Sequence, residues 1–317
     1  MLNYALKRCV LGLVLAWAVL TLLFFALHAV PGDPAEVLLT GEGAGSVSPE
    51  AVAEVRAQLG LDRPLFAQYG SYLAGAVTGD LGTSFTDGAS VLSAVADRLP
   101  ATAEIVLAAA VIGVVTGVLA GSWAARGGRV ADTVTGIATS LGVSIPVYVL
   151  GSLLVLWVAL TMQWLPAGGF RSFGSDPAGH LERAVLPVAV LSVGFAAVVA
   201  RTTRSAVLET SRQDWVRTGR ALGMTRGEVF RVHILRNALG PTVTVTGLEI
   251  GTLLGSTVLV ERIFNWPGAG SLLIDAVSQR DYPVVQGVVL VIAVVFIALN
   301  ILVDLLHGVL DPRVVHA

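Results

Sequence analysis

Charged residues are scarce in this chain, and cysteine and lysine are almost absent. Only 13% of its 317 residues are charged, whereas 55% are hydrophobic and the mean hydropathy is +0.78. A soluble domain carries about 25% charged residues, and a water-soluble fold of this size could not bury so much apolar surface. The single cysteine, Cys9, excludes a disulfide framework or a cysteine-based metal site. The sequence therefore predicts an integral membrane protein.

Other absences narrow the chemistry. The phosphate-binding motif Gly-x-x-x-x-Gly-Lys-Ser/Thr does not occur, and Lys7 is the only lysine, so ATP and magnesium would have to be bound by a partner. The five histidines are scattered, and none forms a metal-ligand pair at helical spacing. The formal net charge of −2 gives no reason to expect nucleic acid as a partner. We therefore expect no metal or cofactor within this chain.

Six apolar stretches are long enough to cross a membrane as helices, which takes about 20 residues each. They run approximately over Val10–Val30, Thr102–Trp123, Val134–Leu160, Val185–Ala200, Leu239–Val260 and Val284–Leu306. The first is too long for a typical signal sequence and lacks a cleavage site of small residues, so we interpret it as a retained helix. The sequence thus predicts an all-α membrane protein with six transmembrane helices.

Arginines are distributed unevenly between the two sides of such a bundle. The loop 201–236 contains eight arginines and three acidic residues, and with six spans it shares a side with both termini. The opposite segment, 31–99, contains nine acidic residues and three arginines. Because positive loops stay in the cytoplasm, both termini are expected there. The predicted divisions are 1–97, the first helix and an external acidic segment; 98–308, a transmembrane core with the cytoplasmic loop; and 309–317, a cytoplasmic tail.

Small residues at four-residue spacing occur in the second, third and fifth predicted helices. They are Gly113, Gly117 and Gly121; Gly136, Ser140 and Ser144; and Gly247, Gly251 and Gly255. Small residues at this spacing let two helices approach closely in lipid. We favour packing within the bundle of this chain, and a seam with a second subunit is the alternative.

The fifth predicted helix also has a polar face. At 100° per residue, Thr242, Thr246, Glu249 and Ser256 fall within an arc of roughly 80°. A carboxyl group that faces lipid near the bilayer centre costs on the order of 2.5–3.5 kcal/mol. Glu249 should therefore face protein, a cavity or a partner charge. Two interpretations stay open: Glu249 lines a path through the membrane together with Thr246 and Ser256, or it is a protonated or hydrogen-bonded structural acid.

The arginine-rich loop combines charge with a helical pattern. Its central stretch reads Asp214-Trp215-Val216-Arg217-Thr218-Gly219-Arg220-Ala221-Leu222-Gly223. Gly223 predicts the end of one helix, and Thr225 with Glu228 predicts the cap of the next, so two short helices should lie along the membrane surface. Anionic lipid would require only charge, whereas Trp215 and Leu222 favour docking into a groove of another protein.

This stretch resembles the cytoplasmic loop of ATP-driven importer permeases of the dipeptide, oligopeptide and nickel branch. That branch commonly reads Asp-Tyr-Val-Arg-Thr-Ala-Arg-Ala-x-Gly; here Trp215 replaces Tyr and Gly219 replaces Ala, and the glutamate of the general Glu-Ala-Ala pattern is absent. Other motifs of the branch follow in order along almost the whole chain, although His307 stands where Tyr is frequent and is assigned no role. They are His28–Pro34, Leu59–Pro64, Gly79–Ser84, Arg98–Thr102, Trp164–Gly169, Phe264–Gly270, Arg280–Pro283, Asn300–Asp304 and Asp311–Arg313.

The resemblance implies a type I importer permease fold in the cytoplasmic (inner) membrane and a transport subunit rather than an enzyme. It also implies partners besides the lipid bilayer: a second, similar permease, two cytoplasmic ATPases that bind ATP and magnesium, and an external substrate-binding protein. The residues that it assigns to coupling with an ATPase are Asp214, Trp215, Arg217, Thr218, Gly219, Arg220, Ala221, Leu222 and Gly223. Short peptides are the favoured cargo, and nickel ion or a peptide-like or oligosaccharide cargo is the alternative.

Two other classes of membrane protein are weighed against this interpretation. A secondary transporter needs coupling-ion residues at mid-membrane, for which Glu249 is the one deep candidate. An intramembrane serine hydrolase needs a nucleophile that faces a histidine, but Ser271 is expected on the external side and no histidine lies deep in a predicted helix. Retention of an ATPase by the tagged protein in membrane extracts would distinguish the importer from both.

Overall fold

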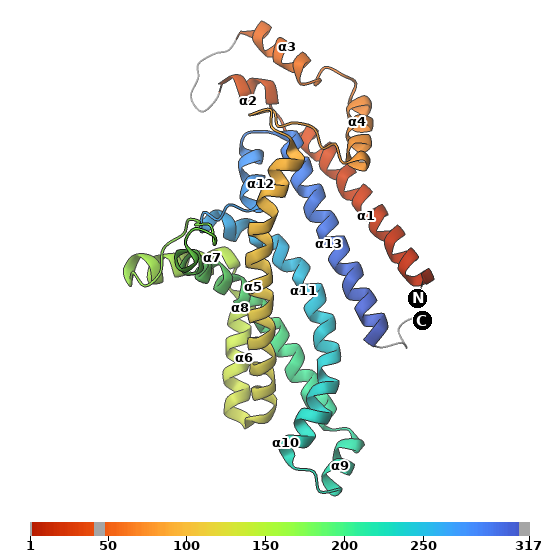
Figure 1. Ribbon diagram of the computed structural model, residues 1–317, viewed down its shortest axis with the longest axis vertical. Helices are drawn as coiled ribbons and strands as arrows, with labels where there is room; N and C mark the ends of the chain where they lie inside the picture. Colours follow the sequence, from red (N-terminus) through yellow and green to blue (C-terminus); the bar gives the residue numbers. More distant parts are fainter. Residues whose placement is uncertain (1, 41–47, 311–317) are drawn as a thin grey trace. The chain divides into compact units, whose positions relative to one another are not determined.

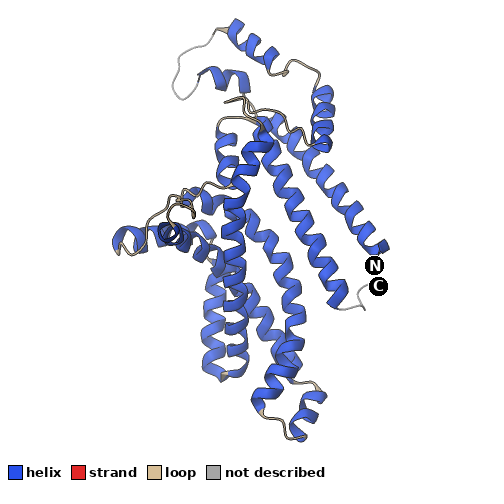
Figure 2. Ribbon diagram, viewed as in Figure 1, coloured by secondary structure: helices blue, strands red, loops and turns tan. Residues whose placement is uncertain are grey.

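The computed structural model describes residues 2–40 and 48–310, and this part of the chain is almost entirely helical (Figures 1 and 2). Its helices are α1 (Leu2–Ala29), α2 (Pro34–Thr40), α3 (Pro49–Gln58), α4 (Leu65–Thr78), α5 (Val91–Arg126), α6 (Gly128–Ser144), α7 (Val147–Leu154), α8 (Pro177–Ser211), α9 (Asp214–Ala221), α10 (Arg226–Glu228), α11 (Arg236–Ile263), α12 (Ala269–Ser278) and α13 (Tyr282–Leu310), with π-helical turns η1 (Val155–Thr161) and η2 (Val229–Leu235). Extended pairing in these residues is limited to one isolated bridge, Thr83 to Ser90. The predicted all-α class is confirmed.

Part of the predicted C-terminal region lies outside this description. Residues 311–317, which hold most of the predicted tail and the Asp311–Arg313 motif, are not among the described residues, and neither are the side chains of Asp304 and His307.

Five described helices are long and apolar enough to cross a membrane alone, and a bent pair makes a sixth candidate span if its two helices are counted as one. The five are Arg8–Ala29, Val91–Arg126, Pro177–Ser211, Arg226–Ile263 and Tyr282–Ile301. In the pair, Gly128–Ser144 and Val147–Thr161 meet at an angle of 101°. The described residues therefore contain five or six candidate spans, and the third predicted span corresponds to the bent pair.

The prediction of one continuous helix from Val134 to Leu160 is wrong. Ile145 has an extended backbone (φ −79°, ψ 119°) and directly precedes Pro146. A proline disfavours the helical conformation in the residue before it and has no N–H to continue the hydrogen-bond ladder. The helix therefore stops at Ser144, after a last backbone hydrogen bond from Ile145 N–H to the Leu141 carbonyl at 3.0 Å.

Two further elements differ from the expected ones. The fourth span is part of the much longer helix α8, whose first turn is capped by Asp176 through a 2.9 Å hydrogen bond from the Gly179 N–H. The capping box of Thr225 and Glu228 is present as predicted, because each side chain bonds the other residue's backbone N–H. However, the helix that starts there is not a separate surface helix, since it continues through η2 into α11 and forms one candidate span.

The described chain forms two compact units. One contains residues 1–102 and 267–301, and the other contains residues 103–266 and 302–317. The first unit has an apolar core made by the start of α5 with α12 and α13, and its buried members are Val91, Val95, Ala269, Ala276, Val284, Val285 and Val288. The predicted sequence boundary after residue 97 stays a prediction.

In the second unit, the glycines of α5 let that helix approach α8. A Cβ atom placed on Gly117 would lie 2.8 Å from Cγ1 of Val199 and 2.9 Å from the carbonyl oxygen of Ala196. Those separations are shorter than van der Waals contact, and a backbone carbonyl cannot move aside without disturbing its helix. The predicted packing of small residues within the bundle is confirmed for α5.

The small residues of α6 do not pack against another helix as those of α5 do. Gly136, Ser140 and Ser144 are exposed, and a Cβ atom on Gly136 would meet no other atom of the described residues within 4 Å. For α6 the predicted packing within the chain is therefore wrong, because α6 packs on α8 through a different face. In α11 the small residues are divided, since Gly247 is buried and Gly255 is exposed.

Candidate functional site

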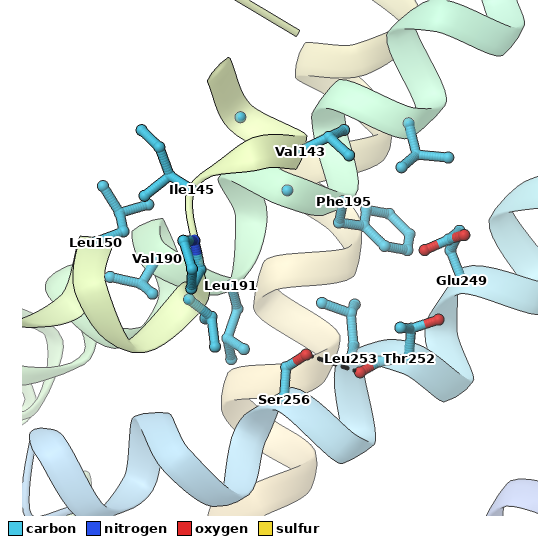
Figure 3. Close-up of a pocket in the computed structure, with 15 residues that line it drawn as sticks. Val143, Ile145, Leu150, Val190, Leu191, Phe195, Glu249, Thr252, Leu253 and Ser256 are labelled. Atoms are coloured by element: carbon cyan, nitrogen blue, oxygen red, sulfur yellow. Dashed lines mark hydrogen bonds between the residues drawn. The ribbon is translucent and has the colours of Figure 1, made fainter. Parts of the chain in front are cut away.

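An open pocket of about 290 Å³ lies in the second unit, at the break between α6 and α7 (Figure 3). The end of α6, the start of α7, and parts of α8 and α11 line it. Most lining side chains are apolar, for example Val143, Leu191 and Phe195, whereas the polar side chains come from α11. The pocket exists because Pro146 interrupts a span that would otherwise have filled this space with helix.

Glu249 is the charged side chain of this pocket. It is half-buried on α11, and within the described residues its carboxylate makes no hydrogen bond or ion pair. A structural acid at membrane depth is expected to have a hydrogen-bonding or charged partner. The absence of one among the described residues, together with the open pocket beside it, favours the interpretation of Glu249 as a lining residue.

The structure divides the predicted polar face of α11. Ser256 lines the pocket, and its hydroxyl donates to the Thr252 carbonyl at 3.0 Å (Figure 3). Thr246 is half-buried and is not among the lining residues. Thr242 is buried, and its hydroxyl lies 3.3 Å from that of Thr203 on α8. Thr252 also lines the pocket; its position three residues after Glu249 could have revealed it, although the prediction did not include it.

A second, more polar pocket of about 410 Å³ lies along α6 and α8. An ion pair forms one wall of it: Asp132 on α6 accepts from both Nε and Nη2 of Arg204 on α8, the latter at 2.7 Å. The other polar lining residues are Thr135, Thr139, Ser140, Arg201 and Ser205. Sequence reasoning missed this pocket because α6 and α8 are far apart in the chain.

The predicted coupling stretch is the helix α9 and the turn after it. The buried residue of α9 is Val216, which packs against Val229, Phe230 and Ile234 where η2 leads into α11. The opposite side is open. Among the predicted coupling residues, the exposed ones are Asp214, Trp215, Arg217, Thr218, Arg220, Ala221, Leu222 and Gly223.

The two glycines of this stretch have different surroundings. Gly219 is half-buried, and a Cβ atom there would lie 3.5 Å from the sulfur of Met224, so this residue faces the chain's own core. Gly223 is exposed with φ +86°, a left-handed conformation that ends α9. The predicted end of the helix at Gly223 is confirmed, whereas the assignment of these residues to an ATPase stays a prediction.

In the first unit, motifs far apart in sequence meet at a buried carboxylate. Asp281 is 3% exposed and accepts hydrogen bonds from the Ser84 hydroxyl at 2.5 Å and from the backbone N–H groups of Phe85 at 3.2 Å and Thr86 at 3.4 Å. The same carboxylate caps α13 by accepting from the Val284 N–H at 3.3 Å. The segments 79–84 and 280–283, which carried the family resemblance, are thus joined in space.

Other motif segments are also joined. In the first unit, the Arg56 guanidinium pairs with both Asp33 and Asp62, and these partners raise its pKa above the usual arginine value. In the second unit, the Gly169 N–H donates to the Phe264 carbonyl at 2.8 Å, which ties the segment after η1 to the end of α11. These motif segments therefore contribute contacts that hold their own units together.

Comparisons with known proteins agree with this arrangement. Residues 113–316 match the family described as "Binding-protein-dependent transport system inner membrane component", and residues 1–106 match its N-terminal companion family. The dipeptide transport system permease protein DppB of Escherichia coli (strain K12) is 40% identical over 100% of this chain and 99% of its own length. The di/tripeptide transport system permease protein DppB of Pseudomonas aeruginosa is 39% identical with the same coverage.

A solved structure shares the fold. A crystal structure described as an amino acid ABC transporter with histidines matches with a TM-score of 0.52 and 18% identity, covering 70% of this chain and 94% of the other. The two family matches together cover nearly the whole chain, and a relative is 40% identical over its full length. Both kinds of comparison give the same family for this chain. This chain belongs to the inner-membrane components of binding-protein-dependent transport systems, the multi-pass permease subunits of ATP-binding-cassette importers.

Proposed function

We propose that this chain forms half of a path by which short peptides cross the cytoplasmic membrane. The observation that carries this proposal is Glu249, a carboxylate without a described partner, in an open pocket where a membrane-crossing helix is broken. Substrate sites at membrane depth are often built where helices are discontinuous. A free peptide carries an α-ammonium group, and a carboxylate in a low-dielectric pocket would attract it.

The cargo is proposed from the relatives. Three relatives are named for dipeptides, di/tripeptides and, in Brucella abortus, peptides in general. Those names favour peptides over nickel ion or an oligosaccharide for this chain. The cargo is tested by uptake of a labelled dipeptide, a labelled longer peptide and nickel ion into cells with and without the gene. Loss of peptide uptake alone, restored by the wild-type gene, is expected; loss of nickel uptake alone would contradict the proposal.

The other half of the path and the driving force would come from partners. A second permease would complete the path, a substrate-binding protein would deliver cargo from outside, and two ATPases would bind ATP and magnesium. The exposed side of α9 supports an ATPase as its partner, because Arg217 and Arg220 can steer an acidic surface and the half-exposed Trp215 can anchor the contact. The arginine-rich side of the chain would then be cytoplasmic, together with both termini.

The role of Glu249 is tested by Glu249→Gln, which keeps the shape and removes the charge. We expect dipeptide uptake to fall about tenfold, which corresponds to about 1.4 kcal/mol of lost attraction, while the amount of protein in the membrane is unchanged. Glu182→Gln, an exposed glutamate on α8, serves as the matched control and should transport normally. Equal uptake by both variants would show that Glu249 is not part of the path.

A further inference from the structure

Three pockets of the second unit follow one face of α8. From α8, Gly194 and Val198 line the pocket of Glu249. Arg201 and Ser205 line both the polar pocket and a third opening near Pro241. At 100° per residue these four α8 positions fall within an arc of roughly 60°. The three openings therefore follow one another along the same face of α8, which we call the groove of α8.

The neighbouring helix α6 follows the same groove. Val143 lines the pocket of Glu249, and Thr139, Gly136 and Asp132 line the polar pocket in that order. Because α6 and α8 are packed together and pair Asp132 with Arg204, they run antiparallel along the groove. Moving along α8 toward α9 thus leads from the acidic pocket into the polar one.

Charge changes sign along this groove. The acidic residue of the first pocket is Glu249, and the charged residues of the polar pocket are Arg201 and the pair of Arg204 with Asp132. The pair neutralises Arg204, but Arg201 is exposed and its guanidinium makes no hydrogen bond or ion pair within the described residues. The polar pocket therefore has a surplus of one positive charge, and the hydroxyl groups of Ser140 and Ser205 lie on its lining.

The step from one pocket to the next along α8 is short. The lining of the pocket of Glu249 ends on α8 at Val198, and Arg201 and Arg204 of the polar pocket follow it by about 4.5 and 9 Å of helical rise. An extended dipeptide or tripeptide is at most about 7 or 11 Å long. A short peptide that extends from the pocket of Glu249 along α8 can therefore reach Arg201 with its carboxylate.

Resting on the proposed function, we infer that the polar pocket between α6 and α8 binds the free α-carboxylate of the transported peptide through Arg201. Ser140 and Ser205 donate further hydrogen bonds, and the ion pair of Asp132 and Arg204 holds the two helices in place around the pocket. The peptide passes with its carboxylate leading and its ammonium group trailing toward Glu249. This assigns to the permease a selectivity for free peptide termini that is separate from that of the binding protein.

The test uses the purified importer with its ATPases and second permease, in nanodiscs of phosphatidylcholine and without the binding protein. Binding of dialanine and of dialanine amide is followed by saturation-transfer difference NMR, which detects weak ligands. For the wild type we expect dialanine to bind about tenfold more tightly than its amide, as for the loss of one charge-assisted contact. Arg201→Gln should remove this preference, and Arg201→Lys should keep most of it.

A matched control separates this result from a general loss of positive charge. Arg212→Gln removes an exposed arginine at the end of α8 that does not line the groove, and it should behave as the wild type. Equal affinity of the wild type for dialanine and its amide, or an unchanged preference in Arg201→Gln, would overturn the inference. Cellular uptake of dialanine by the wild type is measured in parallel, and its absence would instead refute the proposed peptide transport.

Discussion

Replacement of Gly223 can distinguish a conformational role from a docking role at the end of α9. Gly223 has φ +86°, and a Cβ atom added there meets no atom within 4 Å in the part of the chain that the structure describes. Inside the chain the cost of a side chain is therefore conformational only. A left-handed backbone costs alanine about 1–2 kcal/mol, and asparagine tolerates it better. For Gly223→Ala, this conformational cost lowers the ratio of the native turn to conformations in which the turn is not formed by about 5- to 30-fold.

The two roles predict different orders of activity for the series Gly223→Ala, Gly223→Asn and Gly223→Trp. If Gly223 only ends the helix, asparagine should transport best, because it accepts the left-handed conformation. If the backbone of Gly223 lies against an ATPase, the loss should grow with side-chain size, so that alanine transports best and tryptophan worst. We expect the second order, with uptake in the tryptophan variant reduced at least tenfold.

The assay compares peptide uptake in cells with ATPase activity in the reconstituted importer. Loss of coupling should abolish the stimulation of ATPase activity by cargo-loaded binding protein, while the amount of permease in the membrane stays normal. Gly128→Trp is the matched control, since Gly128 also has a left-handed backbone (φ +77°) and open space around its Cβ position, but it is the first residue of α6, directly after the break from α5. Normal uptake by Gly223→Trp would refute the coupling assignment.

Three predictions concern the stability of the fold. Gly117→Leu should destabilise the contact of α5 with α8 by about 1–3 kcal/mol through overpacking and lower the melting temperature in detergent, whereas Gly136→Leu, which has open space, should not. Asp281→Ala removes the acceptor of a hydroxyl and three N–H groups and should cost at least about 3 kcal/mol; an unchanged melting temperature would contradict this. The N–H of Gly179 lowers the pKa of Asp176, so its stabilising contribution is present above the ordinary aspartate pKa and is lost as the pH falls through the lowered value. Asp176→Asn should therefore remove the rise in hydrogen exchange of residues 171–183 on acidification below about pH 4, and a rise equal to that of the wild type would be inconsistent with this role.

Local sequence signals predicted the parts of the fold that single segments determine. Apolar length located the five continuous candidate spans and the segment of the bent pair, and the spacing of Thr225 and Glu228 placed a helix cap that the structure contains. The small-residue spacing of α5 was also informative, since Gly117 faces α8 directly. Each of these signals lies within one continuous segment of the chain.

The remaining features depend on contacts that sequence spacing does not encode. The break before Pro146 was readable from proline chemistry, but the apolar length of the segment favoured one helix. The pair of Asp132 and Arg204 joins residues 72 positions apart, so no local pattern could reveal the polar pocket. The exposed face of α6 shows the same limit, because Gly136 has the spacing of a packed helix without a neighbour in this chain.

The buried carboxylate of Asp281 also bears on the order in which the protein matures during synthesis. Ser84 precedes Asp281 by 197 residues, so the ribosome makes the donors of this hydrogen-bond cluster long before their acceptor. Until α13 enters the membrane, the backbone N–H groups of Phe85 and Thr86 have no Asp281 carboxylate to bind, and closing so long a loop is slow. The segment 79–86 of the first unit therefore completes its folding only after α13 is made, so a chain that terminates before Asp281 cannot form this cluster.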